Sequence, residues 1–298
     1  MLDEVALDRE LAAWFAATGR VLEVRAARTP WQILVVEVMS QQTQIERVGP
    51  YWQRFIERWP TPALFATATT REVLDAWAGL GYNRRPLALR DAARRIVAEF
   101  GGEVPSNVET LEALPGVGRY TARAVAASAF GQPVAPVDVN VRRVIGRLAG
   151  VDRLHDVQAE ADRCISRDHP AAWIHAVMDL AVTVCVRRAP ECDTCPVATH
   201  CASRGTPGEP PSADRARATH RLGASRDARS ASETFEASNR WLRGRILRLV
   251  RAEEPGTWLE FTAPLGEHAV GAVHAALAEL ESEGFLERDG DRARLPAT

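Results

Sequence analysis

A proline and two glycines fall within four residues at positions 115–118, directly before a run of small and apolar residues. Neither a regular helix nor a regular strand accommodates that combination, so residues 114–118 (LPGVG) predict a turn, and residues 119–130 predict a helix that begins immediately after it. The backbone N–H groups at such a helix start point one way, and the helix dipole favours an anion there. The turn is therefore a candidate phosphate-binding corner, with a plain connection between two helices as the alternative.

A carboxylate follows this turn and its helix. In the segment 137–144 (VDVNVRRV), Asp138 occupies the N-cap position of a further predicted helix. An aspartate in that position commonly acts as a cap and nothing more. Only one predicted helix and a short connection separate it from the candidate phosphate turn. A second role as a fixed negative charge is therefore an alternative.

A second carboxylate lies in the N-terminal third of the chain. Residues 31–48 predict one helix, and its first half is apolar except for Glu37. At an exposed helix edge this glutamate would have no chemical role. Facing a cavity, it would have a raised pKa because burial disfavours its charge, and it would be a candidate general acid.

Four of the five cysteines fall within the segment 185–201, in the pattern Cys185-x6-Cys192-x2-Cys195-x5-Cys201. In a reducing compartment such a cluster indicates a metal site rather than disulfides. A zinc ribbon usually has two separated Cys-x-x-Cys pairs, whereas this chain has one, but both zinc and an iron–sulfur cluster accept four thiolates. The fifth cysteine, Cys164, is expected to be a small buried residue.

These segments together resemble a known family. LPGVGRYTA and VDVNVRRV resemble the helix-hairpin-helix and the catalytic aspartate of the endonuclease III superfamily of DNA glycosylases, and EVMSQQTQ (37–44) resembles the MutY-type adenine glycosylases within it. The resemblance covers roughly residues 5–203. The cysteine spacing matches the [4Fe–4S] cluster of the superfamily, so the resemblance favours that cluster over zinc.

The resemblance also implies roles for individual residues. Glu37 would be the general acid and Asp138 would face the sugar, supported by Tyr120 and Asn140. Gln42 would enter the base stack, and Tyr82 would lie beside the base opposite the target. The other implied DNA contacts are Gln41, Gly116, Gly118, Arg119, Arg187 and Arg188; the implied base pocket is Arg25 and Trp31; the cluster ligands are Cys185, Cys192, Cys195 and Cys201.

The chain departs from the family pattern at three places. Ser40 replaces the usual leucine, Asn83 replaces a second aromatic residue after Tyr82, and residues 22–25 (LEVR) stand where the family usually has Leu-Pro-Trp-Arg. The family also carries a Nudix-like C-terminal domain, for which the residues after Cys201 are too few. The change at residues 22–25 affects the expected wall of the base pocket, and the lack of room for a Nudix-like domain affects the expected recognition of 8-oxoguanine.

All 37 basic residues are arginine, and the net charge is −2. The overall charge therefore does not indicate a nucleic-acid-binding protein, and any DNA-binding surface must be local. Because a guanidinium stays protonated, no side chain of this sequence can form a Schiff base with a sugar.

We expect a mainly α fold: a two-lobed, all-helical helix-hairpin-helix glycosylase core with an iron–sulfur loop, plus a small C-terminal winged-helix-like α+β module. The expected parts are an iron–sulfur cluster lobe (1–29 and 141–203), a six-helix lobe (30–140), a linker (204–236) rich in Gly, Pro, Ser and Arg, and the module (237–298), which would contact DNA or a protein.

The predicted function is a monofunctional glycosylase that excises adenine mispaired with 8-oxoguanine or guanine from double-stranded DNA. Without a signal pattern or an apolar run of about 18 residues, we expect a monomer in the cytoplasm, associated with the nucleoid and not with a membrane. The alternatives are a thymine or uracil mismatch glycosylase and a non-catalytic iron–sulfur DNA-binding regulator. Glu37 argues against the first, and the presence of both Glu37 and Asp138 argues against the second.

Overall fold

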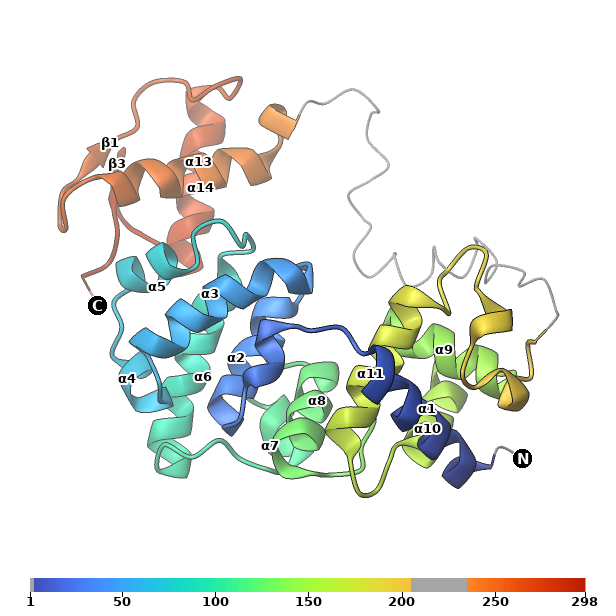
Figure 1. The fold of residues 1–298 in the computed structure, drawn as a ribbon. Helices are drawn as coiled ribbons and strands as arrows, with labels where there is room; N and C mark the ends of the chain where they lie inside the picture. Colours follow the sequence, from blue (N-terminus) through green and yellow to red (C-terminus); the bar gives the residue numbers. More distant parts are fainter. Residues whose placement is uncertain (1–2, 205–234, 298) are drawn as a thin grey trace.

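The structure, a computed structural model, describes residues 3–204 and 235–297. Its first part is built from helices, and its C-terminal part adds a small sheet (Figure 1). This confirms the predicted mainly α fold class. Most of the predicted linker 204–236 lies outside the described residues.

The first group of helices, which we call the hairpin lobe, runs from α2 to α8 and surrounds a core of aromatic side chains. Phe55 lies at the centre of this core, with Trp59, Phe65 and Trp77 at ring-centre distances of 4.9, 4.8 and 6.2 Å. The helices of this lobe are α2 (Pro30–Ser40), α3 (Ile45–Arg58), α4 (Pro62–Ala66), α5 (Thr70–Ala76), α6 (Arg84–Phe100), α7 (Val108–Glu112) and α8 (Arg119–Phe130).

The second group, which we call the cysteine lobe, combines the N-terminal helix with helices that follow α8. It consists of α1 (Glu4–Thr18), α9 (Val139–Ala149), α10 (Leu154–Cys164), α11 (Pro170–Thr183) and the short turns η2 (Cys192–Thr194) and η3 (Ala198–His200). Figure 1 shows α1 beside α10 and α11, far from its sequence neighbour α2. Leu7 and Leu11 of α1 enter the core of this lobe.

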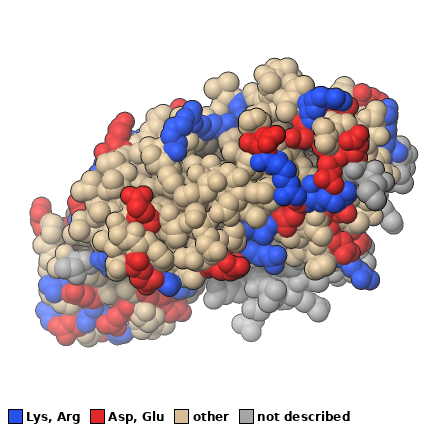
Figure 2. All heavy atoms as spheres, turned by 90° about the horizontal axis from the view of Figure 1, so that it is seen from below, with Lys and Arg blue, Asp and Glu red and all other residues tan. Residues whose placement is uncertain are grey.

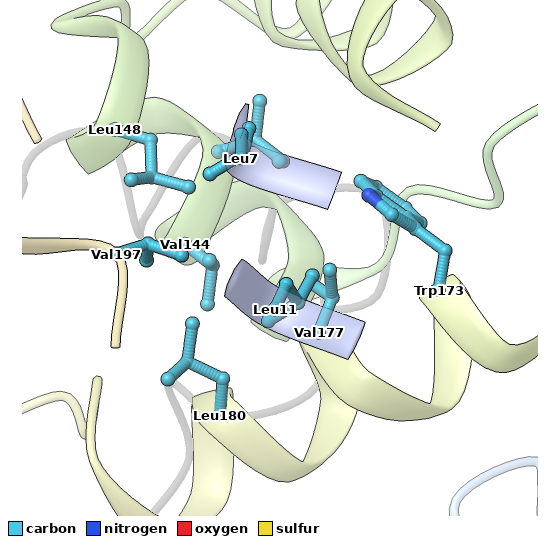
Figure 3. Close-up of a pocket in the computed structure, with 9 residues that line it drawn as sticks. Leu7, Leu11, Val144, Leu148, Trp173, Val177, Leu180 and Val197 are labelled. Carbon is cyan, nitrogen blue, oxygen red and sulfur yellow. The ribbon is translucent and has the colours of Figure 1, made fainter. Parts of the chain in front are cut away.

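These two leucines leave a small apolar cavity of about 10 Å³ (Figure 3). Val144 and Leu148 of α9 and Trp173 of α11 face the same space. A cavity this small and this apolar stays dry, so it belongs to the packing of the core and does not bind a ligand.

The expectation of one helix over residues 31–48 is wrong. Thr29 caps α2 through a capping box with Gln32, but α2 ends at Ser40, and Gln42 adopts a positive φ of 55°. The next helix, α3, starts at Ile45 and continues through Pro50. Proline usually interrupts a helix, yet Pro50 lies inside α3. The chain turns instead at the left-handed Gln42. The short helix α4 was also not expected.

The C-terminal module contains α13 (Asn239–Ala252), β1 (Leu259–Glu260), α14 (Val270–Ser282), β2 (Glu287–Asp289) and β3 (Arg292–Arg294), preceded by the turn η4 (Phe235–Ala237). Its antiparallel sheet has the order β1-β3-β2, with Leu259 opposite Ala293 and Arg288 opposite Ala293 on the other side. Along the chain, two helices are followed by the β2–β3 hairpin, which agrees with the predicted winged-helix-like α+β module. The buried residues of the module join those of the hairpin lobe in one cluster.

The charges are distributed without one dominant sign. Figure 2 shows a face whose centre is uncharged, with acidic and basic side chains interspersed toward its ends. This agrees with the small net charge of −2. None of the described helices combines the length and the apolar character needed to cross a membrane.

Candidate active site

The two candidate carboxylates come from different lobes and act on each other electrostatically. Glu37 lies on α2 of the hairpin lobe and Asp138 begins α9 of the cysteine lobe. Burial, and then the negative charge of Asp138, raises the pKa of Glu37 to about 7. With this raised pKa, Glu37 is a carboxyl group that can hold a proton near neutral pH.

Tyr120, in the first turn of α8, lies in the same electrostatic environment. Burial raises the pKa of its phenol well above the usual value, and the charges of Glu37 and Asp138 raise it further. The phenol therefore stays neutral. The structure thus brings three of the four predicted catalytic side chains together at the junction of the lobes.

The fourth, Asn140, fixes the position of Asp138. One Asp138 oxygen accepts hydrogen bonds from the backbone N–H groups of Asn140 and Val141, both at 2.8 Å, and the other accepts from the Asn140 side-chain amide at 2.9 Å. Three donated hydrogen bonds and the helix N-terminus stabilise a carboxylate charge here. Asp138 therefore caps α9, and its role as a fixed charge stays a prediction.

Arg143, one turn further along α9, connects this group to the cysteine loop. Its guanidinium donates to the Asn140 side-chain oxygen at 3.3 Å, to the Cys185 carbonyl at 2.8 Å and to the Ala181 carbonyl at 2.8 Å. A continuous chain of hydrogen bonds therefore runs from Asp138 through Asn140 and Arg143 to the backbone of the first cysteine. The sequence analysis did not identify Arg143 as a site residue; its place one turn after Asn140 on the same helix was the available signal.

The predicted turn at residues 114–118 joins α7 to α8 as expected. Gly116 adopts a φ of 75°, and a Cβ there would stand 2.8 Å from that of Ala88, so glycine is required both by conformation and by space. Leu114 and Val117 are buried and anchor the turn, while Gly116, Gly118 and Arg119 are exposed. Its open backbone at the start of α8 suits an anion.

Gln41 and Gln42, directly after α2, differ in their surroundings. The Gln41 side chain donates to the Gly116 carbonyl and to the Thr121 hydroxyl, both at 3.2 Å, so it ties α2 to the hairpin turn. Gln42 is exposed at its left-handed position. Of these two side chains, Gln42 is therefore the one that projects from the surface.

Tyr82 is exposed, like the hairpin turn and Gln42. It is 43% exposed and has a φ of 51°, which is unusual for an aromatic residue. Such a conformation costs energy and persists where surrounding contacts impose it. Two guanidinium groups lie over its ring, that of Arg85 at 5.4 Å and that of Arg240 at 4.8 Å from the ring centre.

Arg85 is a second residue that the sequence analysis missed. Its guanidinium joins the end of α2 and the Gln42 turn to the loop that carries Tyr82. It donates hydrogen bonds to the carbonyls of Val38, Met39, Gln41, Leu80 and Gly81 and to the Thr43 hydroxyl. One arginine thus sets the spacing between Gln42 and Tyr82. Nothing in its sequence context distinguished it from the neighbouring arginines.

The two predicted base-pocket residues have partners inside the protein. Arg25 binds Asp179 of α11 at 2.7 Å and the carbonyl of Arg20. The Trp31 indole donates to the Trp59 carbonyl at 2.9 Å and is 3% exposed. Arg25 therefore links the segment before α2 to the cysteine lobe, and Trp31 is part of the hairpin-lobe core. Contact of either with a base stays a prediction.

The four clustered cysteines follow α11 in a loop held by Arg147 of α9. Its guanidinium lies 3.3 Å from the Cys185 sulfur and 2.8 Å from the Val186 carbonyl, and its own carbonyl lies 3.4 Å from the Cys201 sulfur. Within the described parts of the chain, no three histidine, cysteine or carboxylate side chains converge closely enough to hold a metal ion as they stand. Arg187 and Arg188 are exposed on the same loop, whereas Cys164 is buried apart from it.

Comparison with known proteins agrees with this geometry. Residues 35–165 match the model of the HhH-GPD superfamily of base excision DNA repair proteins. The adenine DNA glycosylase of Mycobacterium tuberculosis is 39% identical over 260 residues, which cover 83% of this chain and 79% of that protein. Two solved structures share the fold: a thermostable thymine-DNA glycosylase (TM-score 0.63, 26% identity, 67% of this chain and 95% of that one) and a non-covalent endonuclease III–DNA complex (TM-score 0.57, 27% identity, 68% and 96%). The chain therefore belongs to the adenine DNA glycosylase family within the HhH-GPD superfamily.

Proposed function

We propose that this protein removes adenine paired with 8-oxoguanine or guanine from double-stranded DNA. The observation that carries the proposal is the pair formed by Glu37 and Asp138 across the two lobes, in which burial and the Asp138 charge raise the pKa of Glu37 to about 7. A proton donor with a pKa near neutrality and a fixed negative charge are the two groups needed to cleave an N-glycosidic bond.

The reaction requires the adenine to leave the base stack, because its sugar bond is inaccessible in a duplex. Protonated Glu37 then donates its proton to a purine ring nitrogen. The bond between the base and the sugar C1′ breaks with its electron pair going to the base. The ionised Asp138 stabilises the cationic sugar until water adds to C1′ and releases a proton, leaving an abasic site.

Three exposed features support DNA binding on the surface that leads to this pair. The hairpin turn offers backbone N–H groups for a phosphate, and Gln42 and Tyr82 project from two loops that Arg85 joins. Arg119 and the loop arginines Arg187 and Arg188 are exposed and suit phosphate contacts.

A panel of defined duplexes tests this function. We expect the protein to release adenine opposite 8-oxoguanine and opposite guanine in single turnover, and to release neither thymine nor uracil opposite guanine. Release of thymine or uracil in preference to adenine would instead assign the chain to the activity named for the thermostable structural neighbour. Absence of any base release, together with tight DNA binding, would favour a non-catalytic DNA-binding protein.

We further propose that Cys185, Cys192, Cys195 and Cys201 hold a [4Fe–4S] cluster. The donor set is four thiols, and the Arg147 cation beside the Cys185 sulfur suits a thiolate ligand. The four thiolates would be the protein ligands of the cluster. When bound, the cluster would cross-link the loop that carries Arg187 and Arg188. Iron and sulfide in a ratio of one, without zinc, is the expected analysis of the purified protein; stoichiometric zinc without iron would contradict it.

We also propose that the enzyme cleaves no DNA strand. Capture of the sugar by an amine would need a lysine, and all 37 basic residues are arginine. Borohydride added during turnover should trap no protein–DNA adduct, and strands should break only after alkali or heat. An endonuclease III reaction run in parallel serves as the positive control. A trapped adduct that maps to any residue other than the N-terminal amine would contradict this prediction.

A further inference from the structure

The C-terminal module is attached to the hairpin lobe by specific contacts. Arg251 at the end of α13 pairs with Asp75 of α5 at 2.8 Å, and Arg71 of α5 donates to the Arg251 carbonyl at 2.5 Å. Figure 1 shows the module beside α5, and the buried residues of the two parts form one cluster. The module therefore has a fixed position relative to the surface that carries Tyr82.

The elements that usually read DNA in a helix-turn-helix module are poorly suited to it here. The second helix of such a module normally enters the major groove, yet α14 contains no arginine, and its charged residues are acidic. In the hairpin, Arg294 pairs with Glu287 at 2.7 Å and Arg292 pairs with Asp289, and both guanidinium groups lie over Trp258. These arginines already have partners within the module.

Arg240, in the first turn of α13, is different. It is exposed, and no acidic side chain among the described residues forms an ion pair with it. Its guanidinium lies 4.8 Å from the centre of the Tyr82 ring. The guanidinium also lies against the turn before Tyr82, because a Cβ at Gly81 would stand at an ordinary contact distance of 3.9 Å from it.

Two cations from different parts of the chain consequently lie over the Tyr82 ring. Arg85 stacks from the hairpin lobe, where its six hydrogen bonds fix it in place, and Arg240 stacks from the module. The two stacks fix the ring orientation that the left-handed backbone of Tyr82 alone leaves open.

We propose that Arg240 is a positioning residue for Tyr82, and that the module influences recognition of the base opposite adenine through this stack rather than by placing a helix in a groove. The proposal rests on the proposed function and on the family resemblance, which implies that Tyr82 lies beside that base. It assigns to the module a role that neither its α14 helix nor its hairpin can supply.

The test replaces Arg240 by glutamine, with Arg248→Gln as the matched control, because Arg248 is an exposed arginine on the same helix. Asp75→Asn removes the ion pair with Arg251. This second control shows whether weaker attachment of the module alone changes the measured rates. We expect Arg240→Gln to lower the ratio of single-turnover rates for adenine opposite 8-oxoguanine and opposite guanine by about two- to five-fold, the size of one exposed cation–π contact. Arg240→Lys should restore part of the ratio, and both control variants should leave it unchanged.

Two further measurements separate positioning from other roles. In a Tyr82→Leu background the Arg240→Gln change should have no further effect, because the stack is already absent. The salt dependence of DNA affinity should keep its slope, whereas loss of a direct phosphate contact would reduce that slope by about one. An undiminished effect without Tyr82, a reduced slope, or an unchanged rate ratio in Arg240→Gln would each overturn the proposal.

Binding to a duplex that the protein does not cleave tests the positioning role even if the proposed function fails. If the wild-type protein releases no base from any duplex, the function fails. The coupling between Arg240 and Tyr82 is then measured as the ratio of affinities for duplexes with 8-oxoguanine and with guanine opposite adenine. A coupling absent from both rates and affinities refutes the positioning role alone.

Discussion

Asp138→Asn should lower the single-turnover rate of adenine release by about 10²–10³-fold, the range found when one preorganised electrostatic contact is removed. The change removes the negative charge and keeps the size of the side chain. Asparagine is as good an N-cap as aspartate, so its carbonyl can still accept the two backbone hydrogen bonds at the start of α9. In the wild-type protein the Asn140 side-chain amide donates a hydrogen bond to Asp138. In the variant this amide would instead face the NH₂ group of the new asparagine.

A matched control makes the result specific to charge at this site. Asp3 also caps a helix, accepting a hydrogen bond from the Ala6 backbone at 3.0 Å, so Asp3→Asn makes the same chemical change away from the lobe junction. We expect it to keep the wild-type rate, and Asp138→Asn to keep its affinity for DNA. A wild-type rate in Asp138→Asn would show that the charge has no part in the reaction.

Glu37→Gln should lower the same rate by about 10²–10⁴-fold, because a glutamine cannot donate a proton to the leaving base. The wild-type rate should fall as the pH rises through the pKa of about 7, since the carboxyl group must be protonated to act. The variant should lose this descending limb. Glu57→Gln, at an exposed glutamate of α3, is the control and should keep both rate and pH profile. A descending limb that persists unchanged in Glu37→Gln would assign it to another group.

The raised pKa also predicts a stability effect of defined sign. The carboxyl group binds a proton more tightly in the folded protein, at a pKa of about 7, than at its ordinary value of 4.5. Folded and unfolded states are equally protonated below 4.5, and the folded protein loses stability as the pH rises from 4.5 to 7. Glu37→Gln should therefore raise the free energy of unfolding above pH 7 by up to about 3 kcal/mol and have little effect near pH 4. Denaturant unfolding at the two pH values measures the difference.

The sequence by itself determined the elements that depend on local chemistry. The proline and glycines at 115–118 had to form a turn, and Asp138 had to cap the helix after it. The isolated Glu37 in an apolar helix left two alternatives, an exposed helix edge and a carboxyl group whose charge is disfavoured; the pKa raised by burial agrees with the second. The mainly α fold followed from the same local patterns and from the family resemblance.

Only the tertiary structure decided how these elements meet, because the contacts join residues far apart in the chain. The position of the turn after α2 was wrong in the sequence analysis: Pro50 continues a helix, and the break falls at Gln42, which Arg85 holds in place from another helix. An arginine has the same local signature whether it is exposed or at the centre of six hydrogen bonds. The roles of Arg85 and Arg240 therefore depended on the fold that placed Tyr82 beside them, and the contact of Arg143 with the cysteine loop likewise came only from the tertiary structure.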